Sequence, residues 1–142
     1  PGINCVCHTH PTNTIKILCS SRLHDFANKR LFPDQVVRNG TKSCVVPYAT
    51  PGLPLREAIK TSVEEFIGRN GFFPKLILLK NHGIITTGAS VRECTVSTLM
   101  CEKSAEIFIG AKLLNNIQFL TPQEVAAVDT NPNEKYRREL YQ

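Results

Sequence analysis

Two histidines one residue apart, close to the start of the chain, are the residues best suited to chemistry. His8 and His10 lie in the stretch NCVCHTHPTN, at the end of an apolar run and directly before Pro11. Side chains on a β-strand alternate between its two faces, so the two imidazoles should point the same way. Two imidazoles on one face can bind one metal ion, and such an ion needs a third ligand from elsewhere in the chain.

Of the two remaining histidines, His82 is the better third ligand. It follows a buried apolar run and precedes Gly83, which places it at a strand end, and Gly83 and Gly88 would let a backbone or a ligand come close. His24 lies among polar residues, where we expect a surface or structural role. The pattern of His8, His10 and His82 is a moderate indication of a zinc site, and the alternative is that His82 is an ordinary structural histidine.

Strands and helices that alternate along the chain must position these side chains. Apolar runs predict strands at 3–10, 42–47, 75–80 and 84–87. Capping residues, prolines and periodic apolar positions predict helices at 11–22 with Thr12 or Asn13 as the cap, from Pro54 to Asn70-Gly71, from Ser90 to about Leu114, at 121–128 and briefly after Pro132. Residues 26–41 should have little regular structure. This order predicts an α/β domain, with helices on the faces of a sheet.

Composition excludes several classes of function. The chain has 142 residues, of which 42% are hydrophobic, so it can form one domain with a core. It contains no apolar run long enough to span a membrane and no visible signal peptide, and we expect no membrane partner. The net charge of +5 comes from scattered basic residues without interleaved aromatics, so we expect no nucleic-acid partner. A basic surface could attract an anionic substrate such as a sugar phosphate.

The six cysteines do not have the spacing of a secreted disulfide framework. Most of them lie in apolar contexts, which predicts free thiols and a cytoplasmic protein. Cys5 and Cys7 should share one face of the first strand. A C-x-C pair alone is a weak metal signal, so core packing is the favoured role for both.

The histidine motifs resemble those of the class II aldolase/adducin N-terminal domain family. The resemblance is carried by CVCHTHPTNTIKILCS and by LILLKNHGIITTGASVRECTVSTLMCEKSAEIFIGAK, and it covers about residues 3–128. Members of this family include fuculose-phosphate and rhamnulose-phosphate aldolases, ribulose-phosphate 4-epimerases, methylthioribulose-phosphate dehydratases and the adducin head. The resemblance implies a three-layer α/β/α sandwich around a mainly antiparallel central sheet. It also implies a homotetramer with active sites at the subunit borders.

The resemblance further implies that His8, His10 and His82 bind zinc or another divalent metal. In the family's aldolases the metal holds the two oxygens of an enediolate as a Lewis acid. The expected activity is therefore that of a zinc-dependent lyase, which cleaves or forms a C–C bond of a small sugar phosphate or related hydroxy-carbonyl compound. The alternatives are an epimerase or a dehydratase at the same site, or an adducin-like interaction module that keeps the fold without metal chemistry.

The family's usual acid/base carboxylate and its phosphate-binding loops lie ahead of the H-x-H motif. This chain has seven residues there and none is acidic, so we expect the domain at residues 1–142 to lack an N-terminal segment. Some relatives carry a second carboxylate between the H-x-H motif and the third histidine. Asp34 is the candidate acid or base in that interval, with a turn-forming role as the alternative. The candidates for the tyrosine that the family's aldolases use are Tyr48, Tyr136 and Tyr141.

Overall fold

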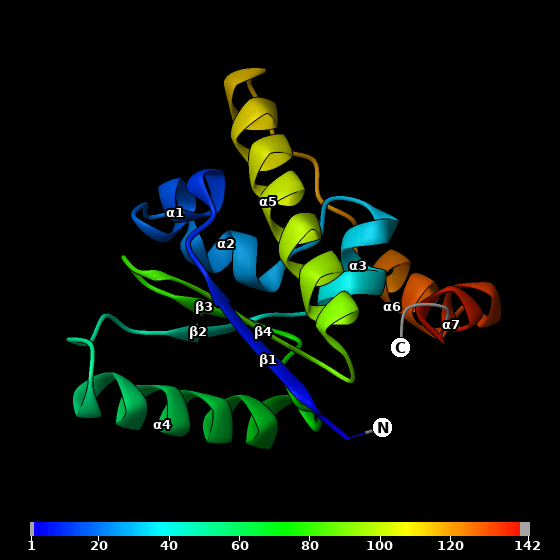
Figure 1. Cartoon of the computed structure of the whole chain (residues 1–142). Helices are drawn as coiled ribbons and strands as arrows, with labels where there is room; N and C mark the ends of the chain where they lie inside the picture. The colour runs from blue at the N-terminus through cyan, green and yellow to red at the C-terminus, as the bar shows by residue number, and fades with distance from the viewer. Residues whose placement is uncertain (1, 140–142) are drawn as a thin grey trace.

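The computed structural model describes residues 2–139, which form one four-stranded sheet. β1 (Cys5–Thr9) pairs antiparallel with β4 (Gly83–Gly88), and β4 pairs antiparallel with β3 (Leu76–Leu79). β2 (Cys44–Val46) pairs with β3 in the parallel direction, which gives the strand order β1-β4-β3-β2 (Figure 1). The sheet is therefore mixed. Two of its three strand pairings are antiparallel, which agrees with the predicted mainly antiparallel sheet.

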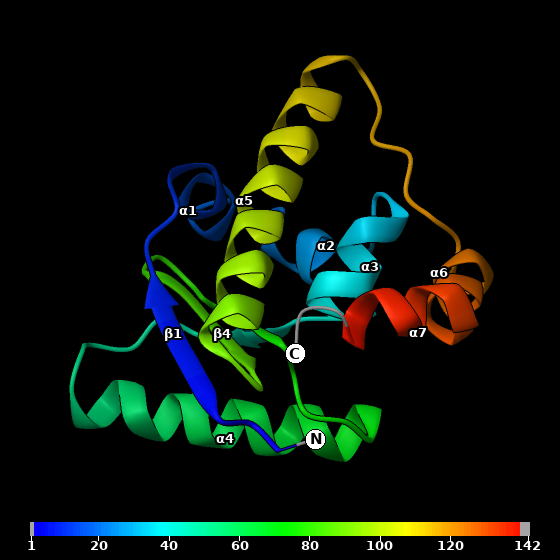
Figure 2. The same cartoon turned by 45° about the vertical axis from the view of Figure 1, so that its right-hand side comes forward.

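Helices cover both faces of the sheet, which confirms the predicted three-layer architecture. α4 (Leu53–Asn70) lies on one face, and α1 (Thr12–Leu18), α2 (Leu23–Asn28) and α5 (Val91–Leu113) lie on the other (Figure 1, Figure 2). β3 is buried on both faces: Leu76 and Leu78 enter the core with α5, whereas Ile77 and Leu79 enter the core with α4. The helices are α1 (Thr12–Leu18), α2 (Leu23–Asn28), α3 (Pro33–Asn39), α4 (Leu53–Asn70), α5 (Val91–Leu113), α6 (Pro122–Thr130) and α7 (Pro132–Glu139).

The long helices begin and end where their capping residues predict. The Ser90 hydroxyl accepts a hydrogen bond from the Glu93 amide at the start of α5. Thr121 and Glu124 form a reciprocal capping box on α6, and Gly71 closes α4 in the left-handed conformation. None of the helices within residues 2–139 is both long enough and apolar enough to cross a membrane.

The prediction that residues 26–41 have little regular structure was wrong, because α2 ends and α3 lies inside this range. Pro33 occupies the first turn of α3, where its fixed φ favours a helix, and Asp34 follows it in the same turn. Arg30, between the two helices, is only 1% exposed. Its guanidinium donates hydrogen bonds to the carbonyls of Phe26, Ala27, Lys29 and Gly40 and to the Ser43 hydroxyl. These contacts hold both short helices against the start of β2.

Native thiol reactivity should separate the exposed cysteine from the buried ones. Cys19 is exposed, and burial raises the pKa of Cys44 to about 11 and those of Cys94 and Cys101 to about 12. Since the thiolate is the reactive form, Cys19 should react with a chromogenic disulfide reagent on the order of 100-fold faster than these three. Denatured protein prepared without reductant should titrate as six thiols. Two or more disulfides would contradict the prediction that the cysteines are free thiols.

Candidate metal centre

The fold brings the three predicted histidines together. His8 comes from β1, His10 from the segment that follows it, and His82 from the turn between β3 and β4. One ligand nitrogen of each imidazole lies within 4.8 Å of the other two. The Nε2 atoms of His8 and His10 are 3.1 Å apart. Two nitrogens bound to one tetrahedral zinc at about 2.0–2.1 Å lie roughly 3.3 Å apart, so this spacing fits a shared ion.

A backbone contact orients the first of these rings. Nδ1 of His8 lies 2.9 Å from the carbonyl oxygen of Ile84, to which a protonated Nδ1 donates. The tautomer with its proton on Nδ1 leaves Nε2 as a free lone pair, directed toward His10. The pairing of His8 with Ile85 in the β1–β4 ladder sets this geometry. The strand pairing therefore fixes both the position of the ring and the nitrogen that it presents.

The third ring, that of His82, carries a buried nitrogen without a partner. Its Nδ1 has no hydrogen-bond partner among the described residues, and a buried polar atom in that state is costly unless something binds it. Burial lowers the pKa of His82, and the neighbouring His8 and His10 lower it further. The neutral imidazole is the form that binds metal. Three converging imidazoles fit a divalent ion such as zinc.

Because Gly83 has no side chain, the turn between β3 and β4 can lie close to the end of β1. A Cβ placed on Gly83 would lie 2.6 Å from the carbonyl oxygen of Thr9 and closer still to Cδ2 of His10. Asn81 has a φ of 55°, the left-handed conformation that tight turns need and that asparagine tolerates. Glycine is therefore required at position 83 for His10 to lie beside the turn, as the sequence suggested.

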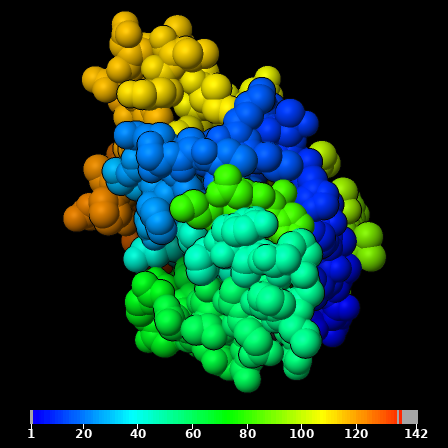
Figure 3. Space-filling view, turned by 90° about the vertical axis from the view of Figure 1, so that its left-hand side faces the viewer, coloured from blue at the N-terminus to red at the C-terminus, as the bar shows by residue number. Residues whose placement is uncertain are grey.

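The carboxyl ends of β1, β2 and β3 meet at the end of the sheet that carries the three histidines. The strand ladders pair Thr9 with Ile84, Leu79 with Gly83 and Val46 with Leu79. Figure 3 looks onto this side of the molecule, where the β3–β4 turn (green) lies between the N-terminal segment (blue) and the segment after β2 (teal). That segment carries Tyr48, whose side chain is 60% exposed. Among the tyrosines proposed by residue type, Tyr48 follows the strand that ends beside the histidines.

The other predicted residues are not brought to the histidines. Asp34 lies in the first turn of α3, a helix that packs against α5, α6 and α7, so its acid/base role stays a prediction. Tyr136 is exposed on α7, which lies across the molecule from the β3–β4 turn (Figure 1, Figure 2). Tyr141 lies outside the described residues. His24 is exposed on α2, which fits the surface role expected for it.

Glu102 is a positioning residue that the sequence alone did not predict. Its carboxylate, on α5, accepts hydrogen bonds from the amides of Asn13 and Thr14 and from the Thr14 hydroxyl, at 2.8–2.9 Å. α1 begins after Pro11 and has no side-chain cap of its own, so the prediction of Thr12 or Asn13 as the cap was wrong. Glu102 supplies the missing acceptor from 88 residues away and ties the segment after His10 to α5.

Glu102→Gln should destabilise the fold by about 1–2 kcal/mol, because the amide can replace only part of the carboxylate's acceptor capacity. Burial acts to raise the pKa of Glu102, but the hydrogen bonds from Asn13 and Thr14 outweigh it and the pKa is lowered. The carboxylate therefore stabilises the native state above its ordinary pKa of about 4.5, and this contribution disappears as the pH falls below that value. Urea unfolding of both proteins at pH 7 and pH 3.5 measures it. An equal difference at both pH values would contradict the capping role.

Comparison with known proteins identifies the family of the chain. The sequence profile of the Class II Aldolase and Adducin N-terminal domain matches residues 1–109. A 3-oxo-tetronate 4-phosphate decarboxylase of Haemophilus influenzae is 29% identical over 126 residues, which are 88% of this chain and 56% of that protein. The crystal structure of YgbL from Klebsiella pneumoniae, described as a putative aldolase/epimerase/decarboxylase, has a TM-score of 0.70 at 29% identity and covers 87% of this chain and 56% of its own.

An L-fuculose 1-phosphate aldolase shares the fold with a TM-score of 0.73 at 19% identity, over 96% of this chain and 57% of that one. The chain thus spans a little over half the length of these relatives. The matched residues include His8, His10 and His82 and all four strands of the sheet. The chain therefore belongs to the Class II Aldolase and Adducin N-terminal domain family.

Proposed function

We propose that this chain carries the zinc centre of a class II aldolase-type lyase that breaks or forms a C–C bond of a small sugar phosphate. The observation that supports this most directly is the convergence of His8, His10 and His82 within 4.8 Å. Three histidine ligands leave a coordination position for substrate oxygen. Two of the relatives, the 3-oxo-tetronate 4-phosphate decarboxylase and the L-fuculose 1-phosphate aldolase, are named for phosphorylated compounds.

The chain's own residues would hold the metal and keep its site open. The three imidazoles bind it, the carbonyl of Ile84 orients His8, and Gly83 leaves room for His10 beside the turn. When bound, a divalent metal acts as a Lewis acid that stabilises negative charge developing on a carbonyl oxygen. We also propose that the protein forms a homotetramer, because the family resemblance implies active sites at subunit borders.

Decarboxylation is the second candidate function, favoured by the 29% identity to a 3-oxo-tetronate 4-phosphate decarboxylase. Loss of CO₂ from a 3-oxo acid and retro-aldol cleavage both break a C–C bond and leave negative charge next to a carbonyl group. The same Lewis acid would serve either reaction. The two differ in the product, which is CO₂ in one case and an aldehyde in the other.

The test is an assay of zinc-loaded protein with L-fuculose 1-phosphate, L-rhamnulose 1-phosphate and 3-oxo-tetronate 4-phosphate. We expect the 142-residue chain to bind zinc but to turn over slowly, because general acid–base assistance is typically worth about 10²–10⁴-fold and no carboxylate joins the three histidines among the described residues. Full activity of the 142-residue chain would place the acid/base group within it, with Asp34→Asn as the next variant.

Protein without bound metal after purification free of chelators would contradict the lyase and favour the adducin-like module. An active enzyme that leaves the C–C bond intact and produces an epimer or a dehydrated product would instead favour the alternative reactions at the same metal. Light scattering measures the proposed tetramer independently of activity.

A further inference from the structure

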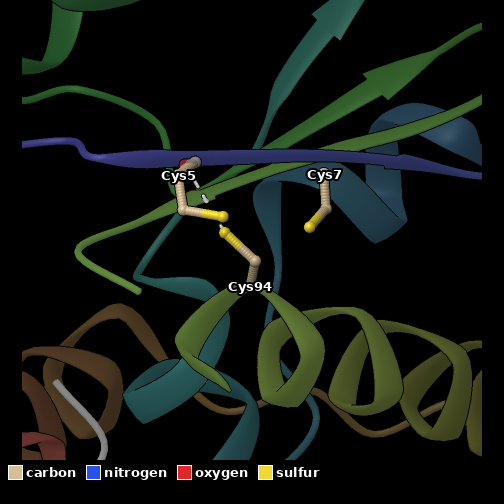
Figure 4. A group of neighbouring side chains, drawn as sticks. All are labelled: Cys5, Cys7 and Cys94. Atoms are coloured by element: carbon tan, nitrogen blue, oxygen red, sulfur yellow. Dashed lines mark hydrogen bonds between the residues drawn. The ribbon is translucent and has the colours of Figure 1, made fainter. Parts of the chain in front are cut away.

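The opposite face of β1 carries a second cluster of ligand atoms. Strand alternation directs His8 to one face and Cys5 and Cys7 to the other. Cys94, the fourth residue of α5, lies against this face, and the sulfurs of the three cysteines are within 4.8 Å of one another. Figure 4 shows Cys5 and Cys7 reaching down from β1 and Cys94 reaching up from α5 toward Cys5.

The position of the cluster allows both access and shielding. Cys94 is fully buried, whereas Cys5 and Cys7 are half-buried, so an ion could enter from the side of the strand. The Cys94 thiol donates weak hydrogen bonds to the carbonyls of Cys5, at 3.5 Å, and Thr86, at 3.7 Å. Core packing alone would be served by any small apolar side chain. Three sulfurs that converge from two elements are instead the ligand set that thiophilic metals prefer.

Charge favours a divalent ion over a monovalent one. Three thiolates around a divalent ion carry a net charge of −1, and around a monovalent ion −2. The site faces the N-terminal part of the 23-residue helix α5, where the helix dipole stabilises negative charge. The smaller negative charge is also easier to bury in a partly apolar environment.

We propose that Cys5, Cys7 and Cys94 form a second metal site, which binds a thiophilic divalent ion such as zinc or cadmium through three thiolates. On binding, three S–H bonds break, three metal–sulfur bonds form and three protons leave to solvent. The bound ion cross-links β1 to α5 on the face opposite the histidine centre. Cys5 and Cys7 directly precede His8 and His10 in the chain and lie on the opposite face of β1, so the chain should hold two ions of different ligand chemistry.

Cadmium titration of the 142-residue chain, in the presence of a phosphine reductant, tests the site through its thiolate-to-metal charge-transfer absorption. We expect one equivalent of cadmium to produce this band. Cys5→Ser and Cys7→Ser should each lower the cadmium affinity at least tenfold and remove about one third of the band. Cys19→Ser is the matched control, because Cys19 is exposed and outside the cluster, and it should change the affinity less than twofold.

The double variant His8→Ala/His10→Ala separates this inference from the proposed function. It should lose the histidine-bound ion and keep the cadmium–thiolate band. Absence of the band in the wild-type chain, or a band that survives both Cys5→Ser and Cys7→Ser, would overturn the sulfur site and leave the histidine centre untouched. The two serine variants keep the test decisive even if Cys94→Ser, at a buried position, fails to fold.

Discussion

Replacing His82 with alanine should remove zinc from the histidine centre. The variant leaves His8 and His10 as the only two histidine ligands of the centre, and two imidazoles hold zinc far more weakly than three. Removing a residue that hydrogen-bonds to a metal ligand already lowers the metal affinity about 10–100-fold. Removing the ligand itself should therefore lower the zinc affinity at least about 100-fold. Competition with a chromogenic chelator measures the affinity of both proteins.

Thermal unfolding with and without zinc is a second measurement on the same variant. A ligand that binds only the native state at 100 times its Kd stabilises that state by about 2.7 kcal/mol. Zinc should therefore raise the unfolding temperature of the wild-type chain by more than that of His82→Ala, which keeps only the proposed sulfur site. His24→Ala is the matched control, because His24 is exposed on α2 and should keep the full response to zinc. Equal zinc affinity in wild type and His82→Ala would exclude His82 as a ligand.

Gly83→Ala should damage the same centre without removing any ligand. The added methyl group would lie 2.6 Å from the Thr9 carbonyl oxygen, a backbone atom that cannot rotate away, and would overlap the ring of His10. β1 and the hairpin must then separate, which displaces His10 from its partners. We expect a loss of about 1–3 kcal/mol in the free energy of unfolding and a loss of roughly 10–100-fold in zinc affinity.

Gly68→Ala controls for the general effect of replacing glycine. A Cβ at position 68 would meet nothing within 4 Å, and Gly68 lies inside α4. Alanine there should stabilise the protein by about 0.5–1 kcal/mol and leave zinc binding unchanged. If Gly83→Ala binds zinc as tightly as wild type, the close approach of His10 to the turn is not needed for the centre.

The sequence by itself determined the elements whose signals are local. The alternation of side chains along a strand is enough to place His8 and His10 on one face, because it depends only on their spacing. Ser90 with Glu93 and Thr121 with Glu124 predicted the starts of α5 and α6, because the capping donor and acceptor are only three residues apart. The selection of His82 combined a strand-end argument with the family resemblance, which supplied the strongest reason.

Tertiary structure alone decided the contacts between residues far apart in the chain. Glu102 caps α1 from 88 residues away, Cys94 joins Cys5 across 89 residues, and Gly83 must be small because of His10. Helices α2 and α3 are too short for a clear helical period, and they depend on the buried guanidinium between them. Such contacts leave no local pattern, because their energy comes from packing elements that only the complete fold brings together.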